Sequence, residues 1–345
     1  MVSLPQIAWV FDLNKCNGCP TCVENCWTLW LSQSPEEKEQ FWCVVLTMPG
    51  LGYPKGWEKM GGGFDAKGNP ILGKIPEDGE LHDWVEYDWR VNKEGKVEIV
   101  DGKPVLLKKK PKWTFNWEED VGGGEWPNSW HFYLPKLCNH CSKPACLAVC
   151  EVGAITKAEN GMVLIDEEKC NGCKKCISAC PYKIPNYNKK LNIVQKCIAC
   201  FPRLEKGVAP ACARACPARA VHFGFLEDKN SSVYKLVKKW KVALPLHPEF
   251  NTEPNVYYVP PLSSPKFDKD GRLTNEERIP IDYLKSLFGP EVERALKTLK
   301  EEREKMRKGM DSELMRILIG FRWPDDFFGG FNKHPDEVFV LEVKK

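Results

Sequence analysis

The sequence predicts an α+β fold in which two small modules are nested, one inside the other, with a long loop-rich insert and a C-terminal helical extension. Three observations lead to this prediction. Sixteen of the 17 cysteines fall into four groups of four. The segment that leads into the first group is repeated before the third, which indicates an internal repeat. A stretch rich in tryptophan and glycine separates the first group from the second.

The four cysteine groups carry the chemistry of the chain. They are Cys16, Cys19, Cys22 and Cys26; Cys138, Cys141, Cys146 and Cys150; Cys170, Cys173, Cys176 and Cys180; and Cys197, Cys200, Cys212 and Cys216. In the third group, C-x2-C-x2-C spacing lets three thiolates hold three irons of one cubane cluster, while the fourth, followed by proline, ligates a different cluster. Zinc is the alternative, but zinc sites usually have two separated C-x2-C pairs, so the pattern favours iron–sulfur clusters.

The segments beside the groups predict how the groups pair. Residues 7–19 and 162–173 both place an apolar strand before Asp-x-x-Lys-Cys-Asn-Gly-Cys. Groups two and four lack this entry strand and share an exit instead, CEVGAI from Cys150 and CPARAV from Cys216. Groups two and three, joined by a turn at 160–161, therefore resemble the middle of a bacterial-type two-cluster ferredoxin. Groups one and four form the outer ferredoxin module.

Exchange of the fourth ligand within each module predicts four [4Fe-4S] clusters. Cluster A takes Cys16, Cys19, Cys22 and Cys216; cluster B takes Cys26, Cys197, Cys200 and Cys212; cluster C takes Cys138, Cys141, Cys146 and Cys180; cluster D takes Cys150, Cys170, Cys173 and Cys176. Each of these cysteines is assigned to one cluster only, and every cluster has four ligands. This agreement supports the scheme.

Two further residues stand close to the motifs. Cys43 is the cysteine left over, and we expect a small buried hydrophobic residue, with a reactive thiol or an extra ligand as the alternative. His140 lies inside a cysteine pair, where we expect a hydrogen bond beside a cluster or a plain loop role rather than ligation. We predict no catalytic residue, because the sequence has neither a phosphate-binding glycine motif nor C-x2-C-H.

The predicted organisation has five parts. These are residues 1–47, the first half of the outer module; 48–130, the insert; 131–190, the inner module; 191–225, the second half of the outer module; and 226–345, the C-terminal extension. In the first part we expect a helix that ends near Leu31 and a strand at 41–47. In the insert we expect short strands around a turn at 101–102, and its tryptophans favour a surface that faces a partner over one that only packs on the core.

The C-terminal extension has weaker signals. We expect a short amphipathic helix near 233–241, then an extended proline-rich run through Pro261. Helical spacing of apolar residues begins after Pro280, and 315–319 is expected to be a short apolar turn. The aromatic tail at 321–345 is expected to lie along this chain or along a partner.

Composition limits the environment of the protein. The net charge of +3, from 50 basic and 47 acidic residues, gives no reason to expect a nucleic-acid partner. We expect no secretory signal and no membrane span, since no stretch approaches about 20 apolar residues. Thiolates that bind metal imply assembly in a reducing compartment. The chain is thus expected to be cytoplasmic or, as we favour, exported to the periplasm together with a partner.

The motifs in this order resemble the electron-transfer (beta) subunits of the dimethyl sulfoxide reductase superfamily of molybdoenzymes. The segments PGLGYPKGWE at 49–58, YLPKLCNHC at 133–141 and WKVALPLHPEFNTEPNVYYVPPLS at 240–263 are similar to the respiratory nitrate reductase branch. That branch also contains nitrite oxidoreductases, selenate, chlorate and perchlorate reductases, and dimethyl sulfide and ethylbenzene dehydrogenases. The resemblance covers residues 7–265.

This resemblance implies a relay. A catalytic alpha subunit would carry a molybdenum bis-pterin cofactor and one further cluster, with cluster A nearest to it and D farthest away. The far partner would be a heme b gamma subunit, a membrane anchor or another acceptor. In respiratory nitrate reductases the position matching Cys173 is typically tryptophan and cluster D has three irons, so the cysteine here predicts a four-iron cluster, with [3Fe-4S] as the alternative. A free-standing polyferredoxin is the alternative function.

Overall fold

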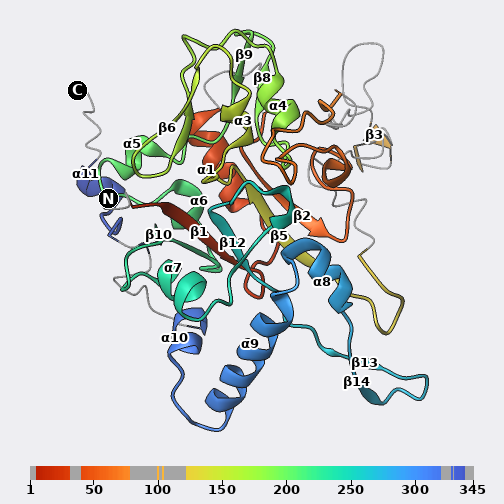
Figure 1. Cartoon of the computed structure of the whole chain (residues 1–345). Helices are drawn as coiled ribbons and strands as arrows, with labels where there is room; N and C mark the ends of the chain where they lie inside the picture. Colours follow the sequence, from red (N-terminus) through yellow and green to blue (C-terminus); the bar gives the residue numbers. More distant parts are fainter. Residues whose placement is uncertain are drawn as a thin grey trace.

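A four-stranded sheet lies at the centre of the computed structural model, which describes residues 5–31, 40–77, 99–100, 103–104, 122–319, 328 and 330–338 (Figure 1). The strand order is β10-β1-β12-β11. These strands are β1 (Ile7–Asp12), β10 (Val221–Phe225), β11 (Leu244–Pro245) and β12 (Val256–Val259). Every residue of β1 is buried. This explains its almost continuous apolar sequence, because a central strand that is covered on both faces cannot alternate with polar residues.

The sheet joins the two ends of the cysteine-bearing region. Strand β1 pairs antiparallel with β10, with Phe11 opposite Val221, as expected for the strands that flank groups one and four. This register places the loop after β1, which holds Cys16, beside the loop before β10, which holds Cys216. On its other side β1 pairs parallel with β12. The proline-rich run, predicted only as extended, thus supplies two strands of the sheet.

A second antiparallel ribbon closes the base of the insert. Strand β2 (Cys43–Met48) pairs with β5 (Phe132–Leu137), so the chain leaves for the insert and returns from it at neighbouring points. Helix α1 (Thr21–Trp30) packs on β2 and on α6 (Ala211–Arg214). The strand predicted at 41–47 and the helix predicted to end near Leu31 are therefore confirmed.

The segment between groups two and three forms a hairpin. Strands β6 (Ile155–Lys157) and β7 (Val163–Ile165) pair antiparallel, and the predicted turn contains Gly161 at a φ of +84°. That value lies in the left-handed region, which glycine occupies without steric cost. The hairpin lies beside a small core of its own, in which Ile155, Val163 and Val194 meet. The neighbouring elements are α3 (Ala145–Ala148), α4 (Lys175–Ala179), β8 (Asn186–Asn188), β9 (Ile193–Gln195) and α5 (Phe201–Leu204).

The described part of the insert packs partly on the core. Trp57, in the 3-10 turn η2 (Trp57–Lys59), is fully buried, and the Lys136 ammonium lies 4.4 Å from its ring centroid. Trp126, in contrast, is 89% exposed. Of the short strands predicted at 97–100 and 105–107, the first is present as β3 (Ile99–Val100), which pairs with β4 (Lys103–Pro104). Residues 105–107 lie outside the described residues. Trp84, Trp89, Trp113 and Trp117 lie outside the described residues.

The C-terminal extension is mainly helical. Its elements are α7 (Ser232–Tyr234), the π-helical turn η3 (Lys235–Lys239), the 3-10 turn η4 (Pro248–Phe250), β13 (Pro265–Phe267), β14 (Leu273–Glu277), α8 (Ile281–Phe288), α9 (Val292–Arg307), α10 (Glu313–Ile319) and α11 (Pro335–Val338). The helix near 233–241 and the helices after Pro280 were predicted. The segment 315–319, expected to be a turn, is instead part of α10, because Leu314, Met315 and Leu318 form an apolar helical face that is buried.

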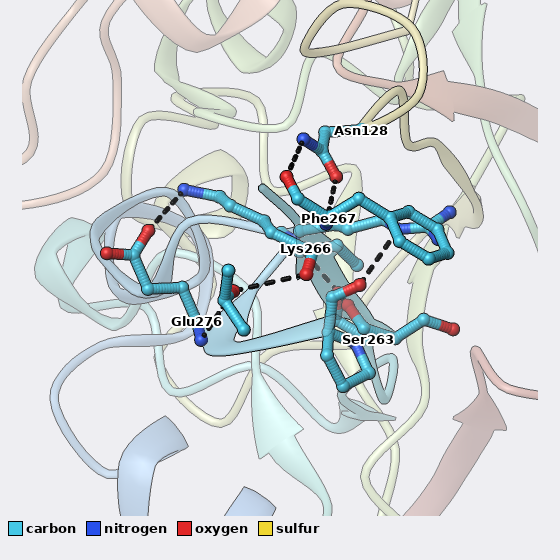
Figure 2. Close-up of polar contacts among 10 residues, drawn as sticks. Asn128, Ser263, Lys266, Phe267 and Glu276 are labelled. Carbon is cyan, nitrogen blue, oxygen red and sulfur yellow. Dashed lines mark hydrogen bonds and ion pairs between the residues drawn. The ribbon is translucent and has the colours of Figure 1, made fainter. Parts of the chain in front are cut away.

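The β13–β14 hairpin was not predicted, and it projects away from the sheet (Figure 1). An amide clamp holds it to the insert (Figure 2). Asn128 donates from Nδ2 to the Phe267 carbonyl at 2.9 Å and accepts the Phe267 N–H on Oδ1 at 2.7 Å. Across the hairpin, Lys266 pairs with Glu276 at 3.1 Å. The end of the insert is therefore joined directly to this hairpin of the C-terminal extension.

The described part of the aromatic tail lies on this chain. Phe328 is buried, and the Phe331 ring packs on Phe223 and Phe225 of β10 at centroid distances of 5.1 and 5.3 Å. The tail was expected to lie either along this chain or along a partner. Its described residues lie along this chain, on the central sheet. No helix in the described ranges is long and apolar enough to cross a bilayer.

Candidate iron–sulfur sites

The fold gathers the cysteine thiols into four sets, which we name sites A to D after the predicted clusters. The thiols near Cys16 are Cys19, Cys22 and Cys216; those near Cys26 include Cys197, Cys200 and Cys212; those near Cys146 are Cys138, Cys141 and Cys180; and those near Cys176 include Cys150, Cys170 and Cys173. Neighbouring sets also touch, since Cys22 lies near Cys26 and Cys180 lies near Cys176. Each predicted set is thus brought together from separate segments of the chain. Ligation by these thiols stays a prediction.

Sites C and D are each arranged around a cavity. Cys138, Cys141, Cys146 and Cys180 line one cavity, and Cys150, Cys170, Cys173 and Cys176 line the other. Apart from the thiols the walls are largely apolar, with Tyr182 and Ile184 at site C and Ile155 and Ile165 at site D. Such walls limit water beside a cluster, and solvent exposure is one of the terms that set cluster potential.

The arrangement of the thiols at sites C and D suits a cubane. In a cubane every thiolate binds a different corner, and at each of these sites four thiols line one cavity.

The pKa values of the thiols also favour a bound metal cluster. Burial, together with the neighbouring thiols Cys22 and Cys216, raises the pKa of the Cys16 thiol to about 12. Burial likewise raises the pKa of Cys176 to about 12, together with Cys173 and Cys170. Four neighbouring thiolates need positive charge to coexist in such a place. Bound metal supplies that charge, and its binding releases the thiol protons.

Several N–H groups point at the candidate ligand sulfurs. The Trp30 indole Nε1 donates to Cys200 Sγ at 3.2 Å in site B, and the Val194 amide donates to Cys170 Sγ at 3.3 Å in site D. In site A the Ala220 amide donates to Cys216 Sγ at 3.4 Å. Hydrogen bonds to cluster sulfurs are among the terms that set reduction potential.

The helices explain why the sites come in neighbouring pairs. Helix α1 carries Cys22 of site A and Cys26 of site B four residues apart, which places them one above the other on the same helix face. The same four-residue step takes the chain from Cys176 of site D, in α4, to Cys180 of site C at the end of that helix. One short helix therefore delivers a thiol to each site of a pair.

Cys43 lies between sites A and B. Its side chain is 2% exposed, as expected of a buried hydrophobic residue. Its thiol is hydrogen-bonded to the Cys22 thiol, and Cys26 and Cys212 are also close. That hydrogen bond and burial together raise the pKa of Cys43 well above its usual value. Sequence reasoning missed this proximity, because it depends on how β2 packs against α1.

His140 is buried and takes no place among the thiols. Its Nδ1 accepts the Val163 N–H at 3.0 Å, and its ring stacks on Trp9 at a centroid distance of 5.6 Å. Burial lowers the pKa of His140 well below its usual value, so the ring is neutral with its proton on Nε2. That nitrogen is buried and has no hydrogen-bond partner among the described residues. The expected structural role in the loop fits these contacts.

Sequence reasoning missed the buried lysines around site C. Lys136, Lys183 and Lys196 all have buried side chains. Burial lowers the pKa of Lys136 to about 7 and that of Lys183 to about 8, although the nearby Cys180 thiolate opposes both shifts. Burial also lowers the pKa of Lys196, but the Cys138 and Cys146 thiolates outweigh it and leave the pKa raised. One sequence feature could have drawn attention to Lys196. It forms a Lys-Cys pair at 196–197, and the same pair occurs in motifs one and three.

Comparison with known proteins agrees with these sites. Residues 129–226 match the family described as a 4Fe-4S dicluster domain. Together with the four thiol sets, this match defines an iron–sulfur electron-transfer protein.

The relatives narrow this class to a family. Selenate reductase subunit beta of Thauera selenatis is 47% identical over 331 residues, which cover 94% of this chain and 99% of the relative. Chlorate reductase subunit beta of Ideonella dechloratans is 48% identical over 332 residues, with coverage of 94% and 99%. Respiratory nitrate reductase subunit beta of Haloferax mediterranei is 44% identical over 347 residues, with coverage of 98% and 94%. The chain belongs to this family of beta subunits, the non-catalytic electron-transfer subunits of molybdoenzymes of the dimethyl sulfoxide reductase superfamily.

Proposed function

We propose that this chain relays electrons through four [4Fe-4S] clusters, held at sites A to D. One end of the relay meets a catalytic alpha subunit with a molybdenum bis-pterin cofactor. The other end meets a heme b gamma subunit, a membrane anchor or another electron partner. The observation that carries the proposal is the gathering of the thiols into four sets, each drawn from two separate motifs.

In this proposal two ferredoxin modules are nested. The outer module joins residues 1–47 and 191–225, and its support is the antiparallel pairing of β1 with β10. The inner module, residues 131–190, is supported by the pairing of β6 with β7. Within each module the fourth cysteine of one motif crosses to the cluster of the other motif.

The order of the relay follows from which sites share an element. Sites A and B share α1, and sites C and D share α4. Sites B and C meet where Cys197 of site B lies within electrostatic reach of Cys138 of site C. The clusters, when bound, each accept and release one electron. The chain holds them in the order A, B, C, D and surrounds them with apolar side chains.

Iron analysis of the anaerobically purified complex tests this proposal. We expect this chain to contribute about sixteen irons, four for each cluster, in addition to the irons of the one further cluster of the alpha subunit and of any heme in the complex. Replacing one proposed ligand, as in Cys146→Ser, should remove or convert one cluster and leave the other three.

The control is Cys43→Ser, which should keep the full iron content, because Cys43 lies beside site A but outside the four sets. Zinc in place of iron, or fewer than four clusters in the unmodified chain, would refute the proposal. Loss of a whole cluster in Cys43→Ser would show that this thiol is a ligand.

A further inference from the structure

The side chain of Lys196 lies between sites B and C. It is 3% exposed, and its backbone directly precedes Cys197 of site B. Its ammonium group is hydrogen-bonded to the Cys138 thiol of site C, and the Cys146 thiol of the same site is close. The lysine therefore contacts one site through its side chain and is joined to the other through the backbone.

The hydrogen bonds of Lys196 identify its charge state. Nζ donates to the Val163 carbonyl, to the Cys197 carbonyl at 3.2 Å and to the Cys138 thiol. A lysine ammonium has three donors and no acceptor, whereas a neutral amine would direct a lone pair at one of these groups. All three partners are acceptors when Cys138 is a thiolate. These contacts suit a charged ammonium, because its three N–H groups then have three acceptors.

Site C has other cations, but they are not shared with site B. Lys136 and Lys183 lie near Cys180, and Lys157 lies near Cys141. Lys196 alone of these four also lies within electrostatic reach of Cys197. Its position therefore distinguishes it from the lysines that surround one site.

The repeat supplies a natural comparison. Lys169 precedes Cys170 of site D just as Lys196 precedes Cys197, but its side chain is 61% exposed and pairs with Asp166 at 2.8 Å. Water and the carboxylate therefore screen its charge. A buried charge is screened much less, so the same residue in the same motif position has a stronger effect in the fourth motif than in the third.

We propose that Lys196 is a fixed cation shared by clusters B and C, which raises the reduction potentials of both and thereby sets the central electron-transfer step of the relay. The inference rests on the proposed function and concerns a residue that ligates neither cluster. Reduction adds one negative charge to a cluster, and a nearby buried cation stabilises that charge. Net charge is one of the terms that set cluster potential.

The test is a redox titration of the whole complex, followed by electron paramagnetic resonance of each cluster. Lys196→Met removes the charge and nearly preserves the length of the side chain. We expect the equilibrium constants for reduction of clusters B and C each to fall at least tenfold, which is a shift of about 59 mV for one electron. Lys196→Arg keeps the charge and should restore both potentials toward those of the unmodified complex.

Lys169→Met is the matched control and should leave clusters B and C unchanged. Unshifted potentials in Lys196→Met with four clusters bound would overturn the proposal, and so would a shift of one cluster alone.

If Lys196→Met loses iron, Lys196→Gln, which keeps N–H donors for the two carbonyls, takes its place. Loss of iron in Lys196→Arg as well would assign the residue a packing role and overturn the proposal. Failure of the proposed relay function would give a different result from failure of the Lys196 proposal, because the unmodified chain would then lack clusters.

Discussion

We expect Cys173 to decide the composition of the cluster proposed for site D. It lines the same cavity as Cys150, Cys170 and Cys176, and it is the exposed member of that set. A cubane iron without its thiolate is readily lost, which leaves a three-iron cluster. Since Cys173 is present, site D has a full set of four thiols.

We therefore predict a four-iron cluster at site D with a lower reduction potential than in relatives with three irons. The fourth thiolate adds negative charge beside the cluster and favours its oxidised form. Cys173→Trp should convert the cluster to three irons and raise its potential. The measurement is electron paramagnetic resonance of the oxidised complex, in which the variant should gain a three-iron signal. Such a signal in the unmodified protein, after verified anaerobic handling, would contradict the prediction.

At the scale of elements, a histidine clamp ties the insert to the segment around η4. His247 contacts Glu58 of η2 through Nε2 at 3.0 Å and Glu249 through Nδ1 at 2.7 Å. Its ring also stacks on Phe250, at a centroid distance of 5.0 Å. Burial lowers the pKa of His247, but the hydrogen bonds to Glu58 and Glu249 outweigh burial and leave the pKa raised.

This clamp should weaken as the pH rises. A histidine whose pKa is higher in the folded state contributes its full stabilisation below the unfolded value of about 6.5 and loses it as the pH passes the folded value. We expect a loss of about 1 kcal/mol or less, because Glu58 is partly exposed. Hydrogen exchange of the Lys59 and Met60 amides, which close the η2 turn, would measure it after correction for intrinsic rates.

The control for the clamp is Glu58→Gln, which keeps a hydrogen-bond acceptor and removes the charge. The pH dependence should become shallower in this variant, since Glu249 alone then remains to favour the charged imidazole. A pH profile that is identical in both proteins would assign the stability of η2 to packing of Trp57 alone.

Elements with local signals were predicted well. The β6–β7 hairpin has a turn at Gly161 between two apolar runs, and α1 follows directly from its cysteine motif. Strand β12 was missed as a strand, because its partner β1 lies far away in the sequence and its neighbours are prolines. The β13–β14 hairpin was missed as well, because its residues are mostly polar and it is held by the Asn128 clamp rather than by a core.

The same distinction holds for the candidate sites. Spacing predicted the sixteen thiols, because a cluster loop is a local motif, and the segments beside the groups, with exchange of the fourth ligand, predicted their four sets. The positions of Cys43, His140 and Lys196 relative to these thiols depend on packing between distant segments. Spacing carries no information about such contacts.

At the scale of the whole molecule, the end of the insert lies against the β13–β14 hairpin of the C-terminal extension. The Asn128 clamp joins them, and Trp126 lies two residues before it with 89% of its surface exposed. Exposed tryptophan is uncommon on a monomer and is typical of the centre of protein interfaces. The described part of the tail packs on β10 of this chain. The insert is therefore the aromatic segment that we still expect to face a partner.

We predict that Trp126 is buried against the catalytic alpha subunit. Trp126→Ala should weaken that association by about 2 kcal/mol, or roughly thirtyfold, as for a residue at the centre of an interface. Dissociation of the co-expressed complex on dilution would measure the change. The control is Leu191→Ala, which removes a side chain that is 50% exposed at the turn between β8 and β9, and which should bind as the unmodified chain does.

Expressed alone, the chain should aggregate or lose iron, and co-expression with the alpha subunit should restore it. A fully loaded, stable monomer, or a Trp126→Ala variant that binds normally, would show that the exposed tryptophan has another role.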